Sequence, residues 1–337
     1  MNNKSTSRKS RKSRSSQFIN EEEDLEGYGL SRIKNEDRER MVYNPGKSLK
    51  SSSKDVPKYL NVSLAYSTLS FVLAFTLTYF PGKLASAVLA SVSNRGPVIY
   101  HDKILFLNIN GWERSDAISI FTAPLVINLI QTLVFFRLFY FLKALAGPLR
   151  FLGFWLMTVS FVRFAGCVLP GFASGEEFGY LAGWLYLNSE LIFISLFLSV
   201  SVLIAGSALL SRWALETAFT KHLVLKKNRL RYLLYVIGLP TLLGGLWISF
   251  MLLLDWNQLA TGQFQFLPHS TSMHEYFLLL ELFLLWVGMS VFLRLYFKVE
   301  IDTVRDLKVL KVNPTVAALL LLLPLVVRIW LGQGWYW

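Results

Sequence analysis

The sequence predicts an all-α, polytopic transmembrane helical bundle of about seven spans. Of its 337 residues, 53% are hydrophobic and 15% are aromatic. The apolar residues are gathered in runs of about 20, the length that crosses the hydrocarbon core of a bilayer. Charge is equally uneven, because 14 of the 34 Lys and Arg lie in the first 58 residues. A composition of this kind exceeds what a soluble domain needs and is typical of a multi-pass membrane protein.

Residues 1–57 form the first predicted domain, a disordered cytoplasmic tail. A basic, Ser-rich block, MNNKSTSRKSRKSRSS, is followed by the acidic block EEEDLE, and no apolar period runs through either. Such a segment cannot bury enough apolar surface to fold alone. We expect the tail to set orientation and its basic residues to meet anionic lipid headgroups rather than nucleic acid.

The second predicted domain, 58–337, contains the transmembrane helices. Seven candidate spans follow Lys58, at approximately 60–80, 116–136, 151–170, 182–211, 231–254, 274–297 and 314–332. Each is long enough to cross about 30 Å at about 1.5 Å per residue.

The basic residues predict the orientation of these spans. With the tail in the cytoplasm and the spans alternating, the inner segments carry 28 of the 34 Lys and Arg, and the outer loops carry four. Lys and Arg gather in this way on the cytoplasmic side of multi-pass proteins. The N-terminus is therefore expected in the cytoplasm and the C-terminus outside. The ending GQGWYW is expected to be an interfacial aromatic anchor.

The one long outer segment, 81–115, is predicted to contain two local structures. Residues 81–92 suit a short helix that is either interfacial or re-entrant, and the sequence leaves that choice open. The stretch NRGPVIYHDKILFLNINGW alternates apolar and polar residues around His101, Asp102 and Lys103. This alternation predicts a small β-hairpin.

Away from the ends of the predicted spans, the ionisable residues are few, and four of them form a candidate charged cluster: Arg163, Glu190, Glu281 and Arg328. Counted from the predicted span ends, all four lie about 6–12 Å below the outer surface. Because each is costly when it faces lipid, we expect two cations and two anions at one depth to pair inside the bundle. Glu190 is the first candidate partner for Arg163, since its span follows directly.

Small residues support an inward position for this charged cluster. A stripe of Ser195, Ser199 and Gly206 follows Glu190 along its span and permits close helix contact. Two interpretations of the cluster remain open. In one, the carboxylates handle protons or cations along a transport path. In the other, the ion pairs fix how the helices pack.

No motif for catalysis, a cofactor or a metal stands out. The sequence has no GxGxxG, P-loop, GxSxG or HExxH pattern, and its single cysteine, Cys167, excludes an intramolecular disulfide and a Cys-based zinc cluster. The stretch HSTSMHE brings together His269, His274 and Glu275, but its spacing is not that of a helix face, so it is a weak candidate for a metal site. We therefore assign no catalytic, cofactor-binding or metal-binding residues.

Three stretches in order along the chain resemble the site-2 family of intramembrane metalloproteases. They are GKLAS at 82–86, Ala123-Pro124 with Asn128, and Gly175-Glu176-Glu177. In that family a zinc-binding HExxH helix precedes a hairpin, a Gly-Pro-x-x-Asn-like stretch follows, and a later span supplies an Asp ligand. This chain departs from the family at every ligand. The resemblance therefore implies a degenerate scaffold without zinc or peptidase activity.

These observations predict a non-enzymatic integral membrane protein that acts as a scaffold or as the partner subunit of another membrane protein. The alternative is a transporter of small solutes or ions that uses the charged cluster. The expected location is the bacterial cytoplasmic membrane. An organelle membrane is the alternative, because the first 19 residues are rich in Ser and Arg and lack acids, as in a transit peptide.

Overall fold

The computed structural model describes eight stretches of the chain. They are 56–100, 104–108, 110–142, 149–175, 177–253, 273–295, 314–332 and 334–336. All belong to one structural unit, Ser51–Trp337. The predicted tail, 1–57, lies outside the described residues except for Val56 and Pro57, which begin the first helix.

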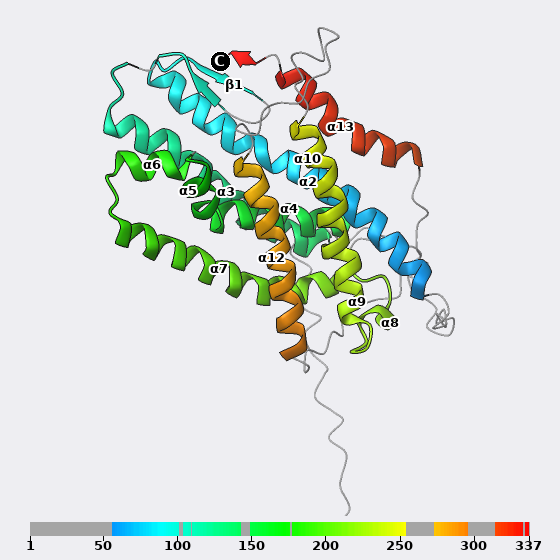
Figure 1. Cartoon of the computed structure of the whole chain (residues 1–337). Helices are drawn as coiled ribbons and strands as arrows, with labels where there is room; N and C mark the ends of the chain where they lie inside the picture. The colour runs from blue at the N-terminus through cyan, green and yellow to red at the C-terminus, as the bar shows by residue number, and fades with distance from the viewer. Residues whose placement is uncertain are drawn as a thin grey trace, which may run out of the picture. The chain divides into compact units, whose positions relative to one another are not determined.

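The described residues are mostly helical (Figure 1). In chain order the elements are α2 (Val56–Val92), β1 (Pro97–Ile99), β2 (Ile104–Phe106), α3 (Arg114–Leu142), α4 (Leu149–Ala165), α5 (Val168–Ser174), α6 (Phe178–Trp184), α7 (Ser189–Glu216), α8 (Lys221–Val224), α9 (Arg229–Leu233), the π-helical turn η3 (Leu234–Gly238), α10 (Leu239–Leu253), α12 (Met273–Leu295), α13 (Pro314–Gly332) and β3 (Trp335–Tyr336).

Helix α2 is the centre of the packing. It contacts α3, α4, α10 and α13, and Figure 1 shows it in blue to cyan between these helices. Phe71 on α2 and Trp155 on α4 are fully buried, with ring centroids 4.7 Å apart. The indole Nε1 of Trp155 donates to Ser67 Oγ at 2.7 Å, and Ser67 Oγ in turn donates to the carbonyl of Val236 in η3. A π-helical turn displaces carbonyls from the regular ladder, and this bond satisfies one of them.

Five of these helices are long and apolar enough to cross a membrane: α2, α3, α7, the continuous run Arg229–Leu252, and His274–Arg294. The chain therefore has the features of a membrane protein. A sixth span is formed if α4 and α5 are counted together, although they meet at a bend of 58°. The predicted third span is thus broken after Ala165. The predicted seventh span, 314–332, is helical, but its apolar part, Ala317–Leu331, is shorter than the helices that can cross a membrane by length and composition, so the described residues give five or six spans and not seven.

The first predicted span, 60–80, is shorter than the helix in the structure. Helix α2 continues through Pro81 to Val92, so residues 81–92 are neither a separate interfacial helix nor a re-entrant one. Pro81 removes one backbone hydrogen bond from the helix. The continuation compensates by burying Lys83, Ser86 and Ala87, among others, against neighbouring elements.

The fourth predicted span, 182–211, starts too early. The short helix α6 ends at Trp184, and α7 begins only at Ser189. Between them Tyr186 adopts a positive φ of 51°, which a continuous helix does not allow. Asn188 then caps α7, because its side chain accepts a hydrogen bond from the backbone N–H of Leu191 at 2.9 Å.

A small sheet of order β2-β1-β3 lies beside the end of α2. β1 and β2 pair antiparallel, with Val98 opposite Leu105, as the predicted hairpin requires. The predicted turn residues 101–103 lie outside the described residues. β3 was not predicted: Trp335 and Tyr336, from the expected aromatic anchor, pair antiparallel with β1.

Candidate functional site

Arg163 is the residue around which the site is built. It lies in the last turn of α4, and only 8% of its surface is exposed. Its guanidinium donates two hydrogen bonds to one carboxylate, from Nη1 to Glu275 Oε1 at 3.3 Å and from Nη2 to Oε2 at 3.0 Å. A bidentate arginine–carboxylate pair of this kind offsets the free-energy cost of burying both charges. The expectation of a buried counter-ion for Arg163 is confirmed.

The predicted counter-ion, Glu190, is wrong. Because α7 begins at Ser189, Glu190 lies in its first turn and is exposed, rather than eight residues inside a span. A carboxylate there is stabilised by the positive end of the helix dipole. The partner is instead Glu275, which the sequence predicts at the outer mouth of the sixth span and not as a member of the charged cluster. Helix α12 begins at Met273, so Glu275 occupies its first turn and faces Arg163.

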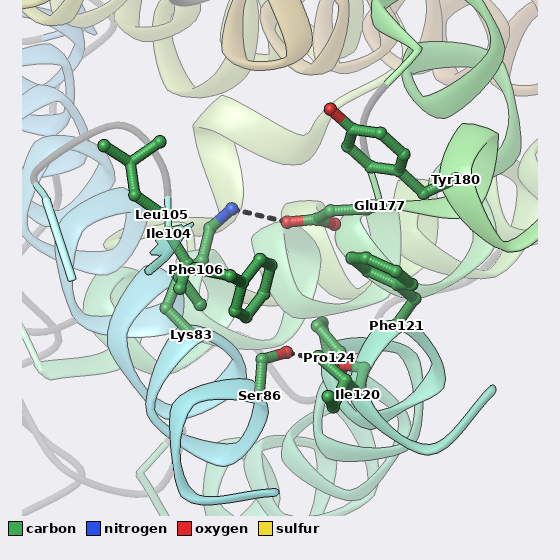
Figure 2. Close-up of a pocket in the computed structure, with 10 residues that line it drawn as sticks. All are labelled: Lys83, Ser86, Ile104, Leu105, Phe106, Ile120, Phe121, Pro124, Glu177 and Tyr180. Carbon is green, nitrogen blue, oxygen red and sulfur yellow. Dashed lines mark hydrogen bonds and ion pairs between the residues drawn. The ribbon is translucent and has the colours of Figure 1, made fainter. Parts of the chain in front are cut away.

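A second, largely buried ion pair belongs to the same site; Figure 2 shows this pair. The ammonium of Lys83, on α2, is 2.6 Å from Glu177 Oε1, and Glu177 immediately precedes α6. The other carboxylate oxygen of Glu177 is 3.6 Å from Nε2 of His274, on α12. The two pairs and His274 therefore connect α2, α4, α12 and the segment before α6. We call Lys83, Arg163, Glu177, His274 and Glu275 the charge network.

Aromatic rings shield this network. The guanidinium carbon of Arg163 lies 4.8 Å from the ring centroid of Phe75 and 5.6 Å from that of Tyr79. The ammonium of Lys83 lies 5.4 Å from the same Tyr79 ring. Cations are attracted to ring faces, and the attraction is stronger where water is excluded. Two consecutive turns of α2 thus support both cations.

The network is electrically balanced, since Lys83 and Arg163 offset Glu177 and Glu275. Burial by itself raises the pKa of Glu177. The charges of Lys83, His274 and Arg163, with the hydrogen bond from Lys83, outweigh burial and lower that pKa to about 2. Glu177 is therefore ionised at neutral pH. Behind the Lys83–Glu177 pair lies a cavity of about 10 Å³, also lined by Asn128, which is room for about one water.

The other two predicted cluster residues are buried near Arg163, but no ion pair joins either of them to the charge network among the described residues. Glu281 on α12 is 3% exposed, and neither carboxylate oxygen has a hydrogen-bond partner among the described residues. It packs against Gly166 at the bend between α4 and α5, where a Cβ would lie 2.0 Å from Glu281 Oε2. Arg328 on α13 is 9% exposed and lines a small cavity with Phe75 and Tyr79.

On the other side of the Lys83–Glu177 pair is a larger pocket (Figure 2). Its volume is about 120 Å³, and its walls come from α2, β2, α3 and α6. The lining residues are Lys83, Ser86, Ile104, Leu105, Phe106, Ile120, Phe121, Pro124, Glu177 and Tyr180. A shallower cavity of about 400 Å³ shares Phe106, Phe121 and Tyr180 with this pocket and adds Trp112 and Trp184. The Lys83–Glu177 pair thus forms the floor of an aromatic pocket.

The three stretches that resemble the metalloprotease family meet at this site. Lys83 and Glu177 form the ion pair just described, and a Cβ on Gly82 would lie 3.4 Å from Pro124 Cβ and 3.9 Å from Asn128 Oδ1. These residues do not fit a zinc ion, because the ammonium of Lys83 already holds the carboxylate of Glu177. Among the described residues no group of three or more His, Cys, Asp or Glu is placed to bind a metal.

His274 and Glu275, from the weak metal candidate, belong to the charge network instead. His269 lies outside the described residues. The sequence does not predict Lys83 and Glu177 as members of the charged cluster, because both lie outside the predicted spans. The signal for Lys83 was its place in GKLASAVLA, whose small and apolar residues continue the helix beyond Pro81.

No protein-family model, curated protein or solved structure matches the chain.

Proposed function

We propose that the chain is a non-enzymatic integral membrane protein, a scaffold or the partner subunit of another membrane protein. The observation that carries this proposal is the charge network, whose cations and carboxylates are matched one to one. Each pair joins segments distant in sequence, Arg163 with Glu275 and Lys83 with Glu177. Charges used in this way hold helices in register. The cavity beside them, among the described residues, is only about 10 Å³, which supports a packing role over a solute path.

The meeting of GKLAS, Ala123-Pro124 with Asn128, and Glu177 supports kinship with an inactive site-2-type scaffold. In that view Gly82 and Ser86 stand where the family has its two histidine ligands, and Lys83 stands where it has its glutamate, so neither zinc ligand of that motif is kept. Such a site would lack the chemistry of a protease. It suits a protein that binds a membrane partner and does not cleave it.

We place the chain in the bacterial cytoplasmic membrane, and the asymmetry of Lys and Arg supports an orientation with the N-terminus inside and the C-terminus outside. The charge network and the aromatic pocket are then near the outer surface. The basic inner segments meet anionic headgroups. An organelle membrane remains the alternative.

A specific observation favours the second candidate function, transport of an ion or small solute. Glu281 is buried without a hydrogen-bond partner among the described residues, and intramembrane carboxylates of this kind often carry protons. In the scaffold, Glu281 is a packing residue at the α4–α5 bend.

A flux measurement separates the two functions. The full chain and Glu281→Gln are reconstituted in liposomes with an internal pH dye, and a pH step is applied with and without a membrane potential. The scaffold predicts no proton flux above protein-free liposomes for either protein. A flux that is present in the natural chain and lost in Glu281→Gln would replace the scaffold by the transporter.

A further inference from the structure

The aromatic pocket has the features of a small-molecule site, which goes beyond a role as a scaffold. Ligand sites are concave, mostly apolar, and carry a few convergent polar groups. Here the apolar walls are mainly aromatic rings, of which Phe106, Trp112 and Phe121 are half-buried and Tyr180 is 53% exposed. Phe121 stacks on Tyr180 with centroids 5.3 Å apart, and on Trp112 with centroids 5.8 Å apart. The inner pocket of about 120 Å³ is close to the roughly 150 Å³ that holds one benzene molecule.

The floor of the pocket selects for an uncharged polar group. Lys83 donates one hydrogen bond to a described residue, Glu177, and an ammonium has three donors. Glu177 accepts one hydrogen bond from a described residue, at Oε1, and a carboxylate has about four acceptor sites, so it keeps capacity to accept. A hydroxyl can accept from Lys83 and donate to Glu177 at once. A carboxylate would face Glu177, and an ammonium would face Lys83.

The position of the pocket along the helices favours an amphiphile. Lys83 lies nine residues before the end of α2, and Phe121 lies seven residues after the start of α3. At 1.5 Å per residue these are depths of about 14 and 10 Å from the helix ends. A molecule with a polar head and an apolar tail collects at this level of a bilayer. The adjoining cavity of about 400 Å³ has space for part of the tail.

We propose that the pocket between β2, α3 and α6 binds an uncharged, ring-bearing amphiphile of the phenol type, with its hydroxyl on Lys83 and Glu177 and its ring among Phe106, Phe121 and Tyr180. The competing view is that these rings are an interfacial belt, which anchors helices without a ligand. A belt faces lipid and has no reason to end on a buried ion pair.

Binding of tritiated 4-octylphenol to the full chain in lipid nanodiscs tests the proposal, with empty nanodiscs subtracted. We expect one saturable site per chain. Three unlabelled competitors define its chemistry: octylbenzene lacks the hydroxyl, 4-octylbenzoate carries a charge, and decanol lacks the ring. Octylbenzene and 4-octylbenzoate should compete about tenfold more weakly than 4-octylphenol. Decanol should compete about two- to tenfold more weakly.

Two phenylalanine variants complete the test. Phe121→Ala should weaken binding at least about threefold, since it removes a wall of the pocket. Phe197→Ala, at an exposed position on α7, is the matched control and should leave binding unchanged. The proposal is overturned by the absence of a saturable site, by equal competition from octylbenzene or 4-octylbenzoate, or by equal weakening in the two variants. None of these results depends on whether the protein is a scaffold or a transporter.

Discussion

Arg163 illustrates what a single residue in the sequence can and cannot reveal. A guanidinium in an apolar run requires a buried counter-ion because an unpaired charge is costly there, and this requirement was predicted. The identity of the counter-ion was not. Moving the start of the fourth span from Ala182 to Ser189 shifts Glu190 by about 10 Å along the helix axis. The depth of a charged residue in the membrane therefore depends on where its helix begins, and an error of seven residues there changes which charges can pair.

Glu177 makes the stability of the protein depend on pH in the acid range. Its pKa is about 2 in the folded protein and 4.5 in the absence of perturbation. A carboxyl with a lowered pKa contributes stability above its unfolded pKa, and this contribution is lost as the pH falls through the folded value. The melting temperature in detergent should therefore fall between about pH 4.5 and pH 2.

Glu177→Gln isolates this effect. The variant should be less stable than the natural chain at pH 6, because it leaves the charge of Lys83 without its partner. The difference between the two proteins should shrink toward pH 2. A difference that stays constant over this range would mean that Glu177 is not an ionised partner of Lys83.

At the scale of elements, runs of about 20 apolar residues predicted the main helices well, because only a continuous helix satisfies its own backbone in lipid. The breaks were not predicted. Composition does not predict the bend after Ala165 or the positive φ of Tyr186, because each lies within an apolar stretch of the sequence. The third strand, β3, could not be predicted, because it has only two residues and alternation of apolar and polar side chains cannot be recognised over so short a stretch.

The stripe of small residues on α7 allows a test of helix packing. Ser199 Oγ donates to the carbonyl of Ala165 at 2.5 Å, and a Cβ on Gly206 would lie 2.2 Å from the ring of Phe161. Gly206→Ala should therefore push α7 from α4 and destabilise the protein by about 1–3 kcal/mol. Gly183→Ala in α6 is the control, because nothing lies within 4 Å of its added Cβ. Denaturation in mixed micelles should show a loss for Gly206→Ala and none for Gly183→Ala.

At the scale of the whole molecule, the charge balance of the loops predicts a topology that cysteine labelling can test. In a Cys167→Ala background, Leu107→Cys and Lys226→Cys place single thiols at exposed positions on the predicted outer and inner sides. A membrane-impermeant maleimide should label residue 107 in intact cells. It should label residue 226 only after permeabilisation. The reverse pattern would invert the orientation and place the aromatic pocket on the cytoplasmic side.

The pairing of Arg163 with Glu275 is the central contact of the charge network, and a double-mutant cycle measures that pairing directly. Arg163→Gln and Glu275→Gln should each cost about 3 kcal/mol of unfolding free energy, because each leaves an uncompensated buried charge. The double variant should lose at least about 1 kcal/mol less than the sum. Arg163→Gln combined with Glu190→Gln should be additive within about 0.5 kcal/mol. Additive losses for Arg163 and Glu275, or coupling of Arg163 to Glu190, would contradict the structure of the charge network.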